Sequence, residues 1–340
     1  MKGTCHKSRL VMALMLMTAS VMAQAITMQA QTVNWYETST PSAREDMAMV
    51  FDPATHSTLL FGGCCNPSET LGDTWIFDVG WRQVFPRSSP SPRTGAAITY
   101  DEAAGNVVLF GGCSGTDTAC TFLNDTWTWN GITWTEQFPP VSPSPRVTSL
   151  AYEKATRTSV LFGGGGGTGA LADTWTWDGV AKTWTQQTPV VSPSARQAPL
   201  VYDSATQTVV LFGGGNWEVA VPRSGGTAYG DTWTWNGATW TQQFPSSAPP
   251  ARSSFSMAYD GLLGMVALFG GAVGGDWPNS TNDTWAWNGS NWTQIHPAKV
   301  PPDRYNFGMD YDSDRKVIVM FGGDRTGPSR NDTWRLALVP

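Results

Sequence analysis

Residues 107–146, VVLFGGCSGTDTACTFLNDTWTWNGITWTEQFPPVSPSPR, contain the pattern that decides the fold. An apolar run, 107–110, ends in two glycines, and the β-rich run 126–129 is followed by Asn-Gly, a strong hairpin signal. Residues 133–137 then return as a further strand. Just upstream, 96–100 alternates apolar and polar residues before a polar turn. The stretch therefore predicts one unit of four short antiparallel strands.

The same unit occurs six times, at spacings of 49 to 57 residues. Each copy has Phe-Gly-Gly, then Asp-Thr-Trp, then in five copies a further Trp, and a Pro-rich stretch that ends in Arg. The glycine motifs begin at Phe61, Phe110, Phe162, Phe212, Phe269 and Phe321, the aspartate motifs at Asp73, Asp125, Asp173, Asp231, Asp283 and Asp332, and the arginines are Arg44, Arg93, Arg146, Arg196, Arg252 and Arg304. Four-stranded units that cannot bury their own faces must pack against copies of themselves.

The two ends of the chain complement each other. The sixth unit has no trailing Trp, whereas Asn34-Trp35 near the N-terminus is followed by Pro41 and Arg44, as in a complete unit. We therefore expect residues 33–37 to pair with residues 333–338 and to close a ring without open edges. The sequence predicts an all-β, six-bladed β-propeller with four-stranded antiparallel blades.

The Gly-Gly pair after an apolar strand, the Asp-Thr-Trp strand, the downstream Trp and the Pro-Arg stretch together resemble kelch repeats, which also form the central domain of galactose oxidase. The resemblance covers about residues 33–340. It implies the propeller fold and leaves function open, because propellers carry many unrelated activities.

Residues 1–23 have the features of a signal peptide: three basic residues, then the apolar run 10–19, then small residues before a cleavage site after Ala23. A membrane anchor needs a longer apolar run. We expect residues 24–340 to form a single propeller domain that is secreted or periplasmic and monomeric. Removal of the signal takes the net charge from −6 to −9, so neither nucleic acid nor membrane insertion is expected.

The cysteines are consistent with export. Cys113 and Cys120 lie at the two ends of one short loop, and we predict a disulfide between them. Cys64 and Cys65 are left as a strained vicinal pair or as separate thiols.

No metal or cofactor site is expected. The mature chain has only His56 and His296, in different units, so a copper site like that of galactose oxidase is not expected. Asp310, Asp312 and Asp314 alternate as in a calcium loop, but Arg315 stands where that loop needs Gly, and the pattern favours a solvated turn.

Residues that recur in every unit are expected to serve the fold. The repeated tryptophans fill space between blades. The six arginines either cap carbonyl groups and pair with the repeated Asp, which we prefer, or form an inward ring that binds a carboxylated sugar, as an arginine cluster does in sialidases.

Function is expected where the copies differ. The segments between Gly-Gly and Asp-Thr-Trp have 9, 12, 8, 16, 11 and 8 residues, and they lie on the same face as the Pro-rich connections. Two tryptophans outside the repeat are in these segments, with charged and aromatic neighbours. The candidate ligand-binding residues are Trp217, Glu218, Arg223, Tyr229, Asp276 and Trp277. The two tryptophans either contact a ligand or fold down onto the blade.

The sequence shows no catalytic constellation. We therefore expect an exported module that binds a protein or a glycan through its variable loops. The alternative is a carbohydrate-active enzyme, either a sialidase-like or lyase-like hydrolase or a sugar mutarotase or epimerase, with a pocket at the propeller centre.

Overall fold

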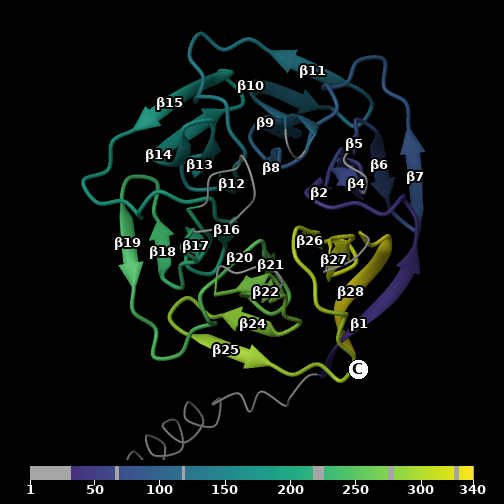
Figure 1. Cartoon of the computed structure of the whole chain (residues 1–340), viewed down its shortest axis with the longest axis vertical. Coiled ribbons are helices and arrows are strands. Elements are labelled where there is room, and N and C mark those ends of the chain that lie inside the picture. Colours follow the sequence, from purple (N-terminus) through teal and green to yellow (C-terminus); the bar gives the residue numbers. More distant parts are fainter. Residues whose placement is uncertain are drawn as a thin grey trace, which may run out of the picture.

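The computed structural model describes residues 32–65, 69–116, 119–216, 226–274, 279–324 and 329–339. The described residues form an all-β, six-bladed propeller (Figure 1). Each blade is a four-stranded antiparallel sheet, and within the described ranges no helix is both long and apolar enough to cross a membrane. The prediction of the fold is confirmed.

The blades follow the chain in order around the ring (Figure 1). Blades 1 to 3 consist of β2 (Ala48–Asp52), β3 (Ser57–Phe61), β6 (Thr74–Phe77) and β7 (Trp81–Val84); β8 (Ala97–Asp101), β9 (Asn106–Thr116), β10 (Ala119–Trp129) and β11 (Trp134–Gln137); and β12 (Leu150–Glu153), β13 (Thr158–Gly166), β14 (Gly169–Asp178) and β15 (Thr183–Gln187). Blades 4 to 6 consist of β16 (Leu200–Asp203), β17 (Thr208–Phe212), β18 (Thr232–Trp235) and β19 (Trp240–Gln243); β21 (Ser256–Asp260), β22 (Met265–Phe269), β24 (Thr284–Trp287) and β25 (Trp292–Ile295); and β26 (Gly308–Asp312), β27 (Val317–Phe321), β28 (Asp332–Val339) and β1 (Thr32–Ser39).

The sixth blade contains strands from both ends of the chain. β1 pairs antiparallel with β28, with Val33 opposite Leu338 and Glu37 opposite Trp334. In Figure 1 β1 lies along the outside of β28, at the position that β7 and β11 occupy in their own blades.

Aromatic side chains fill the space between blades. Trp129, Trp134, Trp177, Trp235, Trp287 and Trp292 are among the largest fully buried side chains. In blade 2 the outer-strand Trp134 packs on Trp129 and reaches Phe61 of blade 1. The repeated tryptophans therefore form the core between blades, as the sequence predicted.

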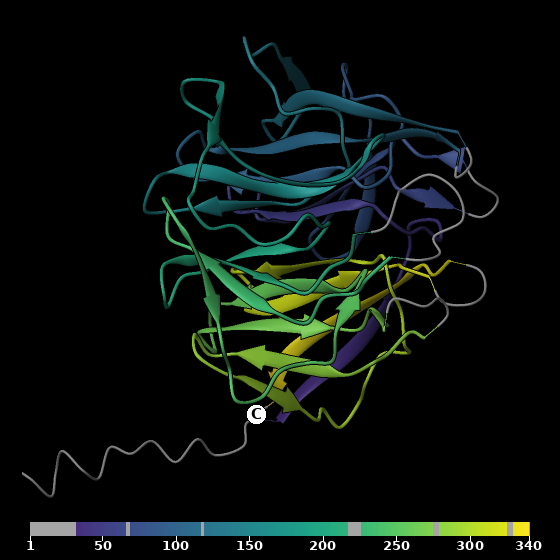
Figure 2. The ribbon, with the colours of Figure 1, turned by 60° about the vertical axis from the view of Figure 1, so that its left-hand side comes forward.

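The disc has two distinct faces (Figure 2). We call the end that carries Gly62–Gly63 and its five counterparts the loop face, because the variable segments and the Arg-containing connections meet there. The turn face, at the other end, carries the four-residue turn 130–133 and its counterparts. Asn130 Oδ1 accepts hydrogen bonds from the N–H groups of Ile132 and Thr133 in this turn, so it is longer than the two-residue hairpin loop that Asn-Gly suggests.

Two blades depart from the expected strand lengths. We expected the second strand to end at Gly-Gly, but β9 continues through Gly111 and Gly112 to Thr116, and β13 continues to Gly166. The glycines take positive φ values of 63° and 98°, and the ladder shifts register opposite them. A glycine bulge thus lets pairing resume beyond the bend, and blades 2 and 3 extend hairpins above the loop face.

Candidate functional site

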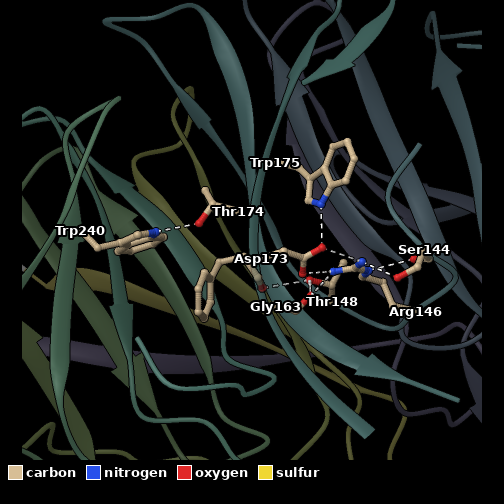
Figure 3. Close-up of polar contacts among 9 residues, drawn as sticks. Ser144, Arg146, Thr148, Gly163, Asp173, Thr174, Trp175 and Trp240 are labelled. Carbon is tan, nitrogen blue, oxygen red and sulfur yellow. Dashed lines mark hydrogen bonds and ion pairs between the residues drawn. The ribbon is translucent and has the colours of Figure 1, made fainter. Parts of the chain in front are cut away.

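The repeated arginines hold the loop face together. Arg146 donates from Nη1 and Nη2 to the two carboxylate oxygens of Asp173, at 2.5 and 3.0 Å, and from Nη1 to the carbonyl of Gly163 at 3.1 Å. Its Nε and Nη2 also bond Ser144 (Figure 3). Every nitrogen of the guanidinium group is therefore bonded to protein.

The same arrangement recurs in all six blades. Each Arg bonds the Asp of its own blade and the carbonyl of the first glycine in the Gly-Gly pair. The pairs are Arg44 with Asp73, Arg93 with Asp125, Arg146 with Asp173, Arg196 with Asp231, Arg252 with Asp283, and Arg304 with Asp332. The arginine side chains are only 0 to 1% exposed, so they cannot bind a sugar carboxylate. The preferred structural interpretation is correct.

A tryptophan completes each pair. Trp175 Nε1 donates to Asp173 Oδ2 at 2.7 Å, and Figure 3 shows the indole pointing at the carboxylate. Burial alone would raise the pKa of Asp173, but the hydrogen bonds from Arg146 and Trp175 and the guanidinium charge outweigh it and hold the pKa below its ordinary value. Asp173 is therefore charged at neutral pH and forms an ion pair with Arg146.

Just beyond each arginine, the chain forms a short backbone bridge with the residue after Gly-Gly, and here the blades differ in side chain. Blades 1 and 6 carry Glu45 opposite Cys64 and Tyr305 opposite Asp324. The other bridges join Thr94 to Cys113, Val147 to Gly165, Gln197 to Gly215 and Ser253 to Ala272. The acidic side chains of these bridges thus lie in the neighbouring blades 1 and 6.

The residues that follow form a hydrogen-bonded arc over blades 5, 6, 1 and 2. Gly95 N donates to Asp46 O, Asp46 N to Asn306 O, and Asn306 N to Ser254 O, each at 2.8 Å. All four residues have φ between 52° and 62°, a left-handed conformation that Gly, Asn and Asp adopt most readily. This arc fixes the side chains of Asp46 and Asn306 at the loop face.

Three potential metal ligands lie together at this arc. Ligand atoms of Glu45, Asp46 and Cys64 are all within 4.8 Å of one another. Asn306 Nδ2 also donates to Glu45 Oε2 at 3.1 Å and to Asp46 Oδ2 at 3.2 Å. This group was not expected from the sequence, because Cys64 lies 19 residues from Glu45 and belongs to none of the ligand spacings considered above. Comparison of the first two residues after each repeated Arg would have identified Glu45-Asp46 as the only consecutive acidic pair.

The extended hairpins of blades 2 and 3 form a raised part of the loop face. The predicted disulfide joins Cys113 of β9 to Cys120 of β10. A Cβ atom added at Gly167, in the tip of the blade 3 hairpin, would lie 3.8 Å from the Phe122 ring of β10. The two hairpins therefore lie close together, and the disulfide links the two strands of the longer one.

The structure places only one of the six ligand-binding candidates. Trp217, Glu218, Arg223, Asp276 and Trp277 lie outside the described residues. Tyr229 is half-buried; its ring lies 3.8 Å from the guanidinium carbon of Arg196, and its N–H and C=O groups bond Gly214 and Arg252. The Tyr229 ring thus packs against the guanidinium group of Arg196. Cys65 belongs to the short strand β4 (Cys64–Cys65), which pairs with β5 (Glu69–Thr70), and Cys64 is buried.

Comparison with known families agrees with this geometry. The model of the KLHDC2/KLHL20/DRC7 Kelch-repeats domain matches residues 19–214 and, in a second placement, residues 81–271. No curated protein matches the chain. Since the family model covers well over half of the sequence and the structure has six blades of the repeated unit, the chain belongs to the Kelch-repeat family.

Proposed function

We propose that this protein is an exported interaction module that binds a partner protein through its loop face. Kelch propellers generally mediate protein binding. One observation carries the proposal: the Arg–Asp–Trp arrangement is the same in six blades, whereas the bridge residues and the segments beyond Gly-Gly differ. A rigid frame that presents variable segments is the arrangement by which a scaffold acquires specificity.

The loop face offers three kinds of contact. Glu45, Asp46 and Asp324 supply acidic groups at blades 1 and 6. The hairpins of blades 2 and 3 supply a raised wall. By their place in the sequence, Trp217 and Trp277 belong to the segments of blades 4 and 5, and aromatic side chains are the commonest hot spots at protein interfaces.

A glycan ligand is less favoured. The arginines that would recognise an acidic sugar are buried in ion pairs. Sugar binding and sugar turnover are therefore tested separately from protein binding.

Site-specific photo-crosslinking tests which face binds. A photoreactive amino acid replaces Thr121, exposed on the blade 2 hairpin, or Ile132, exposed on a turn of the same blade at the opposite face. We expect one discrete protein adduct from the Thr121 position that diminishes in Trp217→Ala and Trp277→Ala. Adducts obtained only from the Ile132 position would refute the loop face as the binding surface.

A glycan array and a sugar-turnover assay on the same purified chain address the alternative. Glycan binding that Trp217→Ala abolishes, without a protein adduct, would replace the protein partner by a glycan. Turnover of a sugar substrate would replace the binding module by an enzyme.

Export has its own test. Cell fractionation of the full-length chain, with thiol alkylation before and after reduction, should place the protein outside the cytoplasm with residues 1–23 removed and with Cys113 and Cys120 blocked until reduction. A full-length cytoplasmic product that carries reactive thiols at both positions would contradict export.

A further inference from the structure

An open cavity of about 370 Å³ lies at the centre of the ring, lined by the innermost strands of the blades. β2, β8, β12, β16, β21 and β26 all contribute to its wall. The interaction surface proposed above does not use this space.

A ring of aromatic side chains surrounds the cavity. Each inner strand contributes one aromatic residue immediately before its terminal acidic residue, and all six line the cavity: Phe51, Tyr100, Tyr152, Tyr202, Tyr259 and Tyr311. The faces of aromatic rings carry negative charge density and attract cations. Positively charged ligands therefore fit this wall better than anions.

A second ring, of carboxylates, lies directly next to the aromatic ring along the chain. The six acidic residues are buried: Asp52, Asp101, Glu153, Asp203, Asp260 and Asp312. Each accepts hydrogen bonds from its own turn; Asp101 Oδ1, for example, accepts from the N–H groups of Ala103 and Ala104 at 3.0 Å.

The pKa values of the tyrosines respond to burial and to these carboxylates. Burial, followed by the charges of Asp203 and Asp260, raises the pKa of Tyr259. Burial, followed by Asp260 and Asp312, does the same to the pKa of Tyr311. Burial is the larger cause of both shifts, and the carboxylates of Asp203, Asp260 and Asp312 add to it, so their negative charge reaches the tyrosine hydroxyl groups.

Asp310 adds a carboxylate to the cavity wall itself. Its Oδ2 accepts from Phe51 N at 2.7 Å and its Oδ1 from Tyr311 N at 2.8 Å. The solvated turn that the sequence pattern suggested for Asp310 is wrong, because the residue lies within β26 and lines the cavity. Besides Asp310 and the tyrosines, the described part of the wall has two ionisable side chains, Glu102 and Lys154. These two side chains form an ion pair at 2.6 Å.

We propose that the central cavity binds a small organic cation of the quaternary-ammonium class, held by the faces of the aromatic ring and by the charge of Asp310. The wall also contains apolar residues, among them Met257, Leu150 and Ala97. A bulky, weakly hydrated cation loses little hydration on entering such a space, whereas a small inorganic cation loses much more.

Choline and its uncharged carbon isostere, 3,3-dimethylbutan-1-ol, are the probes. Calorimetric titration of the purified chain should detect choline binding, with the alcohol at least about tenfold weaker. Potassium chloride at equal ionic strength should not displace choline.

Three variants locate the site. Asp310→Thr removes the charge and keeps an acceptor, because Thr99 at the equivalent position of blade 2 accepts from Tyr152 N at 3.2 Å; it should weaken choline binding about tenfold. Tyr259→Leu should weaken it as well. Tyr259→Phe keeps an aromatic face, as Phe51 does in blade 1, and should bind choline more tightly than Tyr259→Leu. Glu136→Gln on the outer strand β11 makes the same change in net charge as Asp310→Thr and serves as the control.

Melting temperatures confirm that each variant is folded before its affinity is interpreted. Absence of choline binding, equal binding of the alcohol, or affinities unchanged in both Asp310→Thr and Tyr259→Leu would each overturn the proposal.

Discussion

Arg146 and Asp173 are separated by 27 residues in the sequence and joined by two parallel hydrogen bonds at the loop-face end of blade 3. The guanidinium group reaches the carboxylate from the connection that precedes the blade, and the same side chain bonds Gly163 at the end of β13. One buried side chain therefore ties together three segments that are distant in sequence.

Loss of this arginine should be severely destabilising. Arg146→Ala leaves the half-buried Asp173 carboxylate without its partner, and we expect the free energy of unfolding to fall by about 3 kcal/mol. Arg146→Lys should recover little of this, because an ammonium group cannot make the two parallel bonds. Chemical denaturation measures both. Arg82→Ala, at an exposed site on β7, is the control, and equal effects at the two sites would contradict the structural role.

Acid should weaken all six pairs together. The pKa of each paired aspartate is below its ordinary value despite burial. Their stabilisation is complete above the unfolded-state value of 3.8 and is lost as pH falls through the lower folded-state values. Denaturant midpoints should therefore drop steeply below about pH 4. A protein whose stability is constant down to pH 2 would contradict this linkage.

Asp310 should have the opposite effect on stability between about pH 4 and about pH 6. Burial raises its pKa from 3.8 to about 6, so between these values the folded state holds a proton that the unfolded state has released. Its contribution to stability thus falls as pH rises from about 4 through about 6. In Asp310→Thr the midpoint should change less over this window than in the wild type, and identical pH profiles for the two proteins would rule out Asp310 as the source.

The sequence was most informative where the structure repeats. Six occurrences of Phe-Gly-Gly, Asp-Thr-Trp and Arg defined the blades and the Arg–Asp pairing, because one physical requirement recurs in each copy. Glu45, Asp46 and Asn306 were missed, since Glu45 and Asn306 are separated by 261 residues and meet only when the ring brings blades 1 and 6 together. The role of Asp310 was missed for the same reason, because its partner Phe51 belongs to blade 1.

Tryptophans of the repeat and tryptophans outside it should respond differently to replacement by alanine. Trp129→Ala in blade 2 should cost about 3–5 kcal/mol of stability through the cavity it leaves, because this side chain is only 1% exposed. Trp217→Ala and Trp277→Ala should leave the melting temperature close to that of the wild type and weaken partner binding by about 1–3 kcal/mol. Thermal melts of the three variants provide the comparison. If all three melt far below the wild type, Trp217 and Trp277 cover their blades and are not contact residues.

Threonine hydroxyl groups accept hydrogen bonds at the blade interfaces. In five interfaces an outer-strand tryptophan donates from Nε1 to the threonine of the Asp-Thr-Trp motif in the preceding blade. The pairs are Trp81 with Thr333, Trp134 with Thr74, Trp184 with Thr126, Trp240 with Thr174, and Trp292 with Thr232. Figure 3 shows Trp240 and Thr174. The sixth threonine, Thr284, is buried and has no hydrogen-bond partner among the side chains that the structure describes.

The register of β1 indicates the missing donor. Trp35 is opposite Leu336 in the β1–β28 ladder, the position that Trp134 holds opposite Trp129 in blade 2. Because each of the other five threonines accepts from an outer-strand tryptophan, we predict that replacements of Trp35 and Thr284 are energetically coupled. Trp35→Phe and Thr284→Val should each lower the free energy of unfolding by about 1–3 kcal/mol. The double variant should cost clearly less than the sum, as expected for two groups that share one bond. Trp134→Phe with Thr74→Val is the matched cycle for a bond whose 3.1 Å length is known. Strict additivity at Trp35 and Thr284, alongside coupling at Trp134 and Thr74, would show that β1 does not supply the sixth donor.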